Sequence, residues 1–245
     1  MSMADPKSPL PAPQESGFSA GLYRMLAWLS PGFPIGSFSF SHGLEAAAAS
    51  GAVRDRDSLQ HWISAILASG GGRVDADILR DAYRASATDD IRALIEANRR
   101  GVAFRATAET RLETTAQGEA FLATCRTAWP NPFLDRWAEG LSESGGAVCY
   151  SAAVGAATAQ AGIGLDCALL GYLQALAFNL VSAGLRLGII GQTDGQRIVA
   201  ALESVISAAV AGALSRAPEA FGSAAFAVEL ASMDHETQYT RLFRS

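Results

Sequence analysis

Positive charge is scarce in this chain, and almost all of it is arginine. The 245 residues include a single lysine, Lys7, among 19 basic residues, and the formal net charge is −5. Binding to the phosphates of nucleic acid requires a clustered basic face. The charge balance therefore argues against nucleic acid as a partner.

Cysteine is also sparse, and targeting signals are not visible. The number and spacing of Cys125, Cys149 and Cys167 fit neither a disulfide framework nor a zinc knuckle. Residues 1–17 contain four prolines and no apolar run of signal-peptide length. We therefore expect a cytoplasmic protein that begins with a disordered segment, residues 1–17.

Common catalytic motifs are missing as well. The sequence has no GxxxxGK(S/T) phosphate loop, no HExxH or GxSxG motif and no spaced Cys/His cluster. Its three histidines, His42, His61 and His235, lie far apart, and His61 is expected to be exposed at the edge of an amphipathic helix. We predict a non-catalytic protein with no cofactor and no metal site.

What the sequence has in abundance is alanine, at 48 positions, together with apolar residues at helical spacing. The clearest stripe contains Leu59, Ile63 and Ile66, starts after the cap Asp57 and is expected to end at the glycines 70–72. No convincing strand pattern or internal linker is present. We predict a single all-α bundle over 18–231, with helices over 21–29, 39–50, 58–69, 74–85, 90–100, 107–127, 133–142, 147–161, 165–187, 194–214 and 218–230.

The most apolar segment, residues 167–185, runs for nineteen residues without a charge. That length meets the criterion for a membrane span. Gln174 and Asn179 inside the run, and the lack of an aromatic belt or basic flank, favour a buried helix. Because the helix is apolar on every face, we place it at the centre of the bundle.

Three polar residues of this helix, Asn179, Ser182 and Arg186, recur on one side and form a polar seam. A buried arginine requires a partner, because an unpaired charge in a core costs several kcal/mol. The seam is either satisfied inside the bundle or lines a polar passage or an interface.

A compact turn before residue 45 carries further candidates. Residues 30–45 combine Pro31 and Pro34 with Phe33 and Phe38, and we expect these aromatic side chains to face a partner. His42 and Glu45 are three residues apart. This spacing indicates either a polar pair on a helix surface or half of a metal site.

The C-terminal tail, residues 232–245, is unusual because chain ends are ordinarily small, polar and mobile. This one carries aromatic, leucine and arginine side chains, which are enriched at protein interfaces. We expect it to be mobile in the isolated protein and ordered on a partner, although folding back on its own bundle is the alternative. The candidate tail residues are His235, Glu236, Tyr239, Arg241, Leu242, Phe243 and Arg244.

Three ordered motifs together resemble the family of UreF urease accessory proteins. They are LSPGFPIGSF with SHGLE, from residue 29 to 45; Arg186-Leu187 followed by Gly191-Gln192; and HETQY with RLFRS, from residue 235 to 245. The resemblance implies an all-α, non-catalytic adaptor that forms dimers and binds UreD, called UreH in some organisms. This complex recruits the GTPase UreG and helps to insert nickel into apo-urease.

The residue patterns above and the motifs that carry the resemblance together predict a partner-binding surface. It comprises Phe33, Phe38, His42, Glu45, Arg186, Gln192 and the seven tail residues named above. Two other functions remain open from the residues alone. One is a helical membrane-associated protein built on residues 147–161 and 167–185, and the other is a metal-binding bundle that uses His42, Glu45, His61 and His235.

Overall fold

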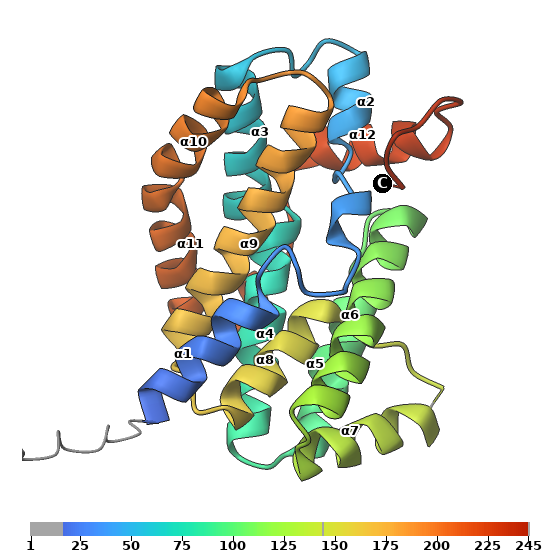
Figure 1. Cartoon of the computed structure of the whole chain (residues 1–245). Coiled ribbons are helices and arrows are strands. Elements are labelled where there is room, and N and C mark those ends of the chain that lie inside the picture. Colours follow the sequence, from blue (N-terminus) through green and yellow to red (C-terminus); the bar gives the residue numbers. More distant parts are fainter. Residues whose placement is uncertain (1–16, 144, 245) are drawn as a thin grey trace, which may run out of the picture.

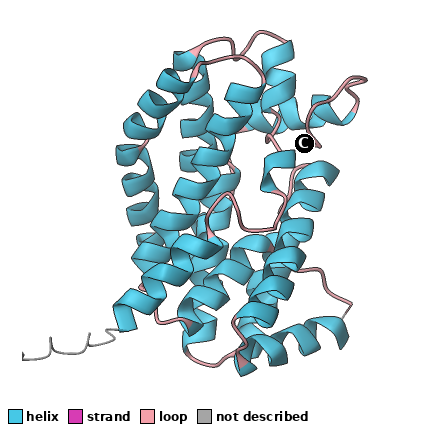
Figure 2. Cartoon of the chain, in the orientation of Figure 1, coloured by secondary structure: helices cyan, strands magenta, loops and turns pink. Residues whose placement is uncertain are grey.

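The chain folds into helices joined by short loops. The structure is a computed structural model that describes residues 17–143 and 145–244, and these residues contain no strand (Figure 2). The expected disordered segment 1–17 lies outside the described residues except for Gly17, which begins α1. The all-α fold class is confirmed. In chain order the elements are α1 (Gly17–Trp28), η1 (Ser37–Ser39), α2 (Leu44–Ala49), α3 (Arg56–Ser69), α4 (Gly71–Ala87), α5 (Ile91–Ala103), α6 (Ala108–Ala128), α7 (Pro132–Glu143), α8 (Tyr150–Gln160), α9 (Leu165–Arg186), α10 (Gln192–Ala201), α11 (Glu203–Ser215), η2 (Pro218–Ala220) and α12 (Phe226–Glu236).

Side-chain caps determine where several of these helices begin. Asp55 accepts a hydrogen bond from the Ser58 amide and caps α3, so the predicted cap Asp57 lies instead in the first turn. Thr107 and Thr110 cap α6 reciprocally. Such caps satisfy backbone N–H groups that have no partner within the helix.

Several predicted boundaries are wrong, and one is the start of the helix expected over 39–50, which begins at Leu44 instead. The helix expected to end at the glycines 70–72 does end there, with Gly70 as the C-cap of α3, but the next helix begins at Gly71 rather than at Val74. The helix predicted over 194–214 is divided at Leu202 into α10 and α11. The last predicted helix, 218–230, is a 3-10 turn followed by α12, which continues to Glu236 and so includes the start of the expected tail.

The most deeply buried helix is α8, which packs against α4 and α6. Every residue from Tyr150 to Thr158 is buried. The contact with α4 is so close that a Cβ on Gly155 would lie 2.4 Å from the Leu79 carbonyl oxygen. Small residues therefore allow the backbones of α4 and α8 to come into direct contact.

Helix α9 packs on α3, α4, α8, α10 and α11, as expected for a central apolar helix (Figure 1). It is not enclosed on every side, however. Leu170 is 48% exposed and Phe178 is 37% exposed. In the second turn of α9, Gly171 faces Met25 of α1 and Leu29, which follows α1. One apolar face of α9 is thus covered in part by α1 and otherwise open.

Two described stretches are long and apolar enough to cross a membrane by length and composition, Leu165–Arg186 and Gln192–Ser215. Half of the first is buried inside the protein, as in the core helix of a folded domain. The second is 22% buried but is interrupted at Leu202, and Ser204 and Ser207 lie on its exposed side. Length and apolarity alone therefore give only weak support to a membrane-spanning role.

The remaining elements meet beside α6. Figure 1 shows α2, α12 and the C-terminal end of the chain gathered next to one end of α6, away from α7. The ion pairs and hydrogen bonds described below connect these segments, which are far apart in sequence.

Candidate functional site

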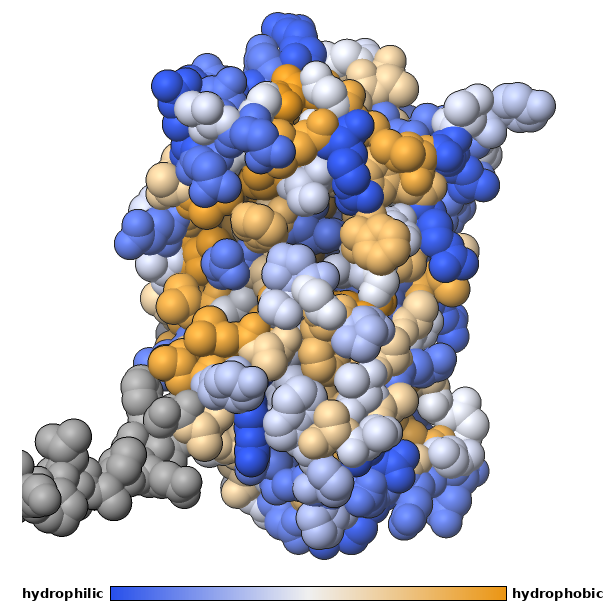
Figure 3. Space-filling model, viewed as in Figure 1, coloured by the Kyte–Doolittle hydropathy of each residue, from blue (hydrophilic) through white to orange (hydrophobic). Residues whose placement is uncertain are grey.

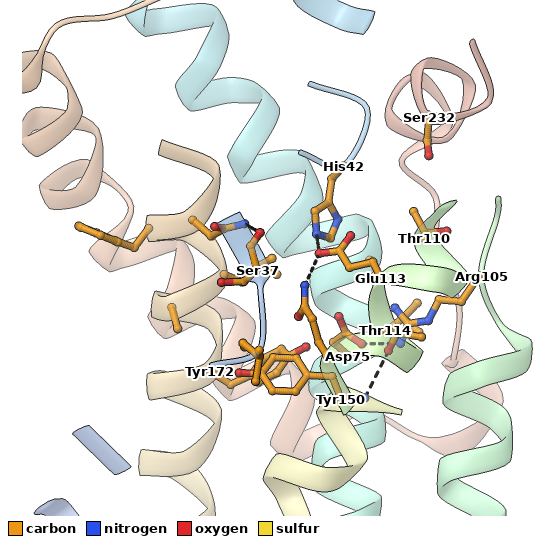
Figure 4. A pocket seen from close by; sticks show the side chains of 18 of the residues that line it. Ser37, His42, Asp75, Arg105, Thr110, Glu113, Thr114, Tyr150, Tyr172 and Ser232 are labelled. Atoms are coloured by element: carbon orange, nitrogen blue, oxygen red, sulfur yellow. Dashed lines mark hydrogen bonds and ion pairs between the residues drawn. The ribbon is translucent and has the colours of Figure 1, made fainter. Parts of the chain in front are cut away.

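A cavity of about 540 Å³ opens between the loop after α1 and the helices α4, α6, α9 and α12. Its apolar wall includes Leu29, Val74 and Leu176, whereas His42, Asp75 and Glu113 carry charge into it (Figure 4). This mixture of apolar wall and a few polar groups is typical of binding cavities in proteins.

His42 contacts α6 across the cavity. Its Nε2 lies 3.1 Å from Glu113 Oε1, and the Gln117 amide donates to the same oxygen. Burial acts to lower the pKa of His42, but the charge and hydrogen bond of Glu113 outweigh it and raise the pKa above the ordinary value of 6.5. His42 also has φ of 53°, an uncommon backbone conformation for a residue other than glycine. Non-helical backbone at residue 42 therefore directs its imidazole toward Glu113.

The second charged pair in the cavity wall is Asp75 with Arg105. Arg105 Nη2 donates to Asp75 Oδ1 at 2.7 Å, and Ser151 Oγ of α8 donates to the same oxygen at 3.0 Å. Both charged side chains are buried. Burial disfavours the guanidinium, but Asp75 outweighs it and raises the pKa of Arg105, so the guanidinium stays charged.

Glu45 of α2 connects three segments of the chain. Its oxygens accept hydrogen bonds from the amides of Leu242, at 2.7 Å, and Phe243, at 2.9 Å. Glu45 Oε2 also lies 3.2 Å from His235 Nε2 of α12. The expectation of a surface pair between His42 and Glu45 is wrong, because His42 precedes the helix and Glu45 is buried.

Glu109 of α6 completes this connection. Its Oε2 lies 2.7 Å from His235 Nδ1, and its Oε1 accepts from Arg241 Nη1 at 2.6 Å. We call Glu45, Glu109 and His235 the carboxylate–histidine cluster. The side chain of His235 is fully buried in it.

The tail is packed on the bundle in this structure, which is the alternative in which it folds back on its own chain. Phe243 is buried, with the guanidinium carbon of Arg186 4.3 Å from its ring centroid. The Arg244 amide donates to Ser39 O at 2.7 Å, and its guanidinium lies 5.9 Å from the ring of Phe40. The attraction between a cation and an aromatic face stabilises both contacts. The tail makes both of these arginine–aromatic contacts with residues of its own chain.

The polar seam of α9 faces these same segments. Asn179 Nδ2 donates to the carbonyl oxygens of Ser37 and Phe40, and Ser182 lines the cavity. Arg186 was expected to be a buried charge, but it is exposed and contacts Phe243. The seam is thus satisfied by the loop before α2 and by the tail.

The structure separates the predicted partner-binding residues into two groups. Phe33 was expected to be exposed, but it is buried with Phe121 and Trp129 in an aromatic cluster. Phe38 is 65% exposed, Tyr239 is fully exposed and Leu242 is 61% exposed. The remaining exposed members are Arg186, Gln192 at the first residue of α10, Glu236, Arg241 and Arg244. His61 is exposed, as predicted.

Four charged residues that the sequence did not single out form much of this site: Asp75, Arg105, Glu109 and Glu113. The signal for two of them was present, since Glu109 and Glu113 are four residues apart and lie on the same face of α6. Glu236 has a role of its own, because Oε1 accepts from the Ala108 amide at 2.7 Å at the start of α6.

Within residues 17–143 and 145–244, no group of three or more histidine, cysteine, aspartate or glutamate side chains has an arrangement that could hold a metal ion. All three cysteines are free. Burial raises the pKa of Cys125 to about 12, so its thiol stays protonated at neutral pH.

A helical body with an open, partly apolar cavity and a C-terminal tail docked on it defines this chain as an all-α protein. The model of the UreF family matches residues 53–203. Over 240 residues the chain is 46% identical to the urease accessory protein UreF of Rhodopseudomonas palustris (strain BisB5), with 98% of each chain covered. It is 44% identical over 234 residues to the urease accessory protein UreF of Granulibacter bethesdensis, with 96% and 98% covered. It is also 44% identical over 231 residues to that of Azorhizobium caulinodans, with 94% and 98% covered.

The chain therefore belongs to the UreF family of urease accessory proteins. These proteins are non-catalytic and take part in urease maturation. Both properties agree with what the sequence motifs predicted, a non-catalytic protein that acts in urease maturation. The match to these relatives extends through nearly the whole chain, so it includes the loop before α2 and α12 as well as the central helices.

Proposed function

We propose that this chain is a cytoplasmic adaptor in nickel delivery to urease. In this role it binds UreD (UreH), and the complex recruits the GTPase UreG and helps to insert nickel into apo-urease. The observation that carries the proposal is the nearly full-length similarity to urease accessory proteins named UreF. The chain itself supplies binding surfaces rather than catalysis, a cofactor or a resident metal.

The surface that best supports binding of UreD and UreG lies on the tail and the neighbouring loop. Phe38, Tyr239 and Leu242 present large apolar side chains to solvent. Arg241 and Arg244 lie among them, and exposed aromatic residues with arginine are typical of interaction hot spots. The buried residues Glu45, His235 and Phe243 hold the tail in place, so they act on partner binding through its position.

Co-purification of UreD and UreG with tagged full-length chain tests this proposal. Tyr239→Ala and Leu242→Ala should each reduce recovery of the complex, by about tenfold or more if either residue is a hot spot. Leu214→Ala, in α11, is the matched control because Leu214 is also exposed and apolar. Undiminished recovery of both partners with the double variant would contradict the proposed surface. Removal of residues 239–245 should have the largest effect.

A second apolar surface supports the proposed homodimer. Leu22 and Leu26 of α1 are 40% and 63% exposed, and Leu170 of the adjacent α9 is 48% exposed. Apolar residues gather on this side of the molecule (Figure 3). We propose that a second copy of the chain covers this face. Leu26→Glu should convert a dimer to a monomer in light scattering, whereas Leu214→Glu should not; a dimer that survives Leu26→Glu would place the interface elsewhere.

Fractionation separates the adaptor from the membrane-associated alternative. The adaptor is expected in the cleared lysate without detergent. Recovery that requires detergent would instead favour a role for Leu165–Arg186 or Gln192–Ser215 in a membrane.

A further inference from the structure

His235 is placed between two carboxylates that both approach its ring nitrogens. Glu109 Oε2 lies 2.7 Å from Nδ1, and Glu45 Oε2 lies 3.2 Å from Nε2. A neutral imidazole carries one N–H and can donate to only one of them, whereas an imidazolium donates to both. In the carboxylate–histidine cluster, both carboxylates therefore receive a hydrogen bond only when the histidine is protonated.

The charges around His235 also balance only when the histidine carries its proton. The charged groups that face it are Glu45 from α2, Glu109 from α6 and, through Glu109, Arg241 from the tail. With His235 protonated, two positive charges balance two negative charges. With His235 neutral, one negative charge is uncompensated among buried side chains, a costly arrangement.

The same two carboxylates hold the tail. Glu45 accepts the backbone N–H groups of Leu242 and Phe243, and Glu109 pairs with Arg241. When His235 loses its proton, one carboxylate faces the lone pair of a ring nitrogen and must turn away from it. Either rotation disturbs a contact that anchors the tail.

A second histidine contact lies one turn further along α6. His42 pairs with Glu113, and it also faces Asp75 from α4 and Arg105 from the segment after α5. Thus the segment 42–45 is joined to α6 at Glu109 and Glu113, through one histidine contact at each position. Deprotonation of His235 and His42 therefore weakens the link between the segment 42–45 and α6 at two places.

We propose that the carboxylate–histidine cluster is a proton-dependent clasp: it holds residues 237–244 on α2 and α6 when His235 is protonated and releases them when His235 is neutral. This inference goes beyond the proposed function, since it concerns the isolated chain and requires no partner. A released tail exposes Phe243 and the carboxylates of Glu45 and Glu109. The protonation of His235 thus controls whether these groups are accessible.

Hydrogen exchange of the purified full-length chain tests the clasp at pH 6.0 and pH 8.5, after correction for the intrinsic exchange rate at each pH. Peptides that cover residues 237–244 should lose protection by about tenfold or more at the higher pH, equivalent to about 1.4 kcal/mol. Peptides from α8, which is buried, should keep theirs. Equal protection of the tail at both pH values would overturn the proposal.

Variants separate His235 from general effects of pH. His235→Gln cannot become positively charged, so its tail should be unprotected at both pH values, whereas His61→Gln, at an exposed position, should behave as the unchanged chain. Glu45→Gln removes one negative charge and also one of the two oxygens that accept the tail amides, so its tail should be less protected at both pH values and its pH dependence should be smaller. A His235→Gln protein that folds and keeps the full pH-dependent step would also overturn the clasp. If that variant does not fold, the decision rests on the unchanged chain and Glu45→Gln.

Discussion

Two contacts between helices in this protein are built in opposite ways. Between α4 and α8 the side chains are small, and a Cβ on Gly155 would lie 2.4 Å from a backbone oxygen of α4. Between α2, α6 and α12 the contact consists of carboxylates, histidines and backbone amides. The first contact depends on the volume of its residues, and the second depends on their charge.

This difference indicates which part of the molecule can change with conditions. A close-packed contact between small residues has one good arrangement, because interiors are packed nearly as densely as organic crystals. A contact made of titratable groups has one arrangement for each protonation state. The α4–α8 contact therefore provides the rigid part of the fold, and the α2–α6–α12 contact provides the adjustable part.

The largest expected effect tests the boundary between these regions, where Arg105 pairs with Asp75. Arg105→Leu leaves a buried carboxylate without its cation and should reduce the free energy of unfolding by about 3 to 5 kcal/mol. Urea denaturation provides the measurement. Arg197→Leu, which breaks the exposed pair with Asp194, is the control and should cost about 1 kcal/mol or less. Equal losses for the two variants would show that burial does not increase the contribution of an ion pair to the free energy of unfolding.

A smaller but still large effect is expected at the close-packed contact. Gly155→Ala places a methyl group against the Leu79 carbonyl and should cost about 1 to 3 kcal/mol. Gly140→Ala is the matched control within a helix, because its Cβ would lie 3.5 Å from Ile95 and only the higher helix propensity of alanine remains. Thermal unfolding should therefore shift in opposite directions. A neutral result for Gly155→Ala would mean that α4 and α8 separate easily.

The charged contact should respond to pH through His42. Because the folded-state pKa of His42 is raised, protonated His42 contributes stability that is fully present below about pH 6.5 and is lost as pH rises through the folded-state value. His42→Gln should therefore be less stable than the unchanged chain at pH 6 and closer to it at pH 8.5. Urea titrations of both proteins across this range give the comparison. If the free energies of unfolding of the two proteins differ by the same amount at every pH, protonation of His42 does not contribute to the stability of this contact.

The smallest effect on stability is expected for Phe38, which faces solvent beside the adjustable region. Phe38→Ala should change the free energy of unfolding by no more than about 0.5 kcal/mol, while it reduces recovery of UreD and UreG. Phe33→Ala is the opposite case, since Phe33 is buried and its loss should cost about 3 to 5 kcal/mol. If Phe38→Ala leaves complex recovery unchanged, the loop before α2 is not part of the partner-binding surface.

Local patterns predicted the helices better than the contacts between them. The α9 helix and the starts of α5 and α6, expected at residues 90 and 107, agree with the structure to within one residue, because periodicity acts over a few residues. The division at Leu202 and the helix start at Gly71 were not predicted. Each depends on how the chain packs onto neighbours distant in sequence.

The site shows the same limit more strongly. The sequence drew attention to Glu45, Arg186, His235 and the tail, but it did not pair them, since Glu45 and His235 are 190 residues apart. Phe33 and Phe38 look equivalent in a turn of prolines and glycines. Only the position of Phe121 and Trp129 makes one a core residue and the other a surface residue.

Gly43 sets the spacing on which the charged contact depends. Its φ is 72°, and a Cβ there would lie 2.7 Å from the Ser232 amide nitrogen of α12. A single methyl group at residue 43 would push α12 outward by a distance comparable to the tolerance of a hydrogen bond, which weakens steeply beyond about 3.2 Å. His235 moves with α12, and Glu45 remains with α2. The missing side chain of Gly43 therefore allows α12 to lie close enough to α2 for the contact between Glu45 and His235.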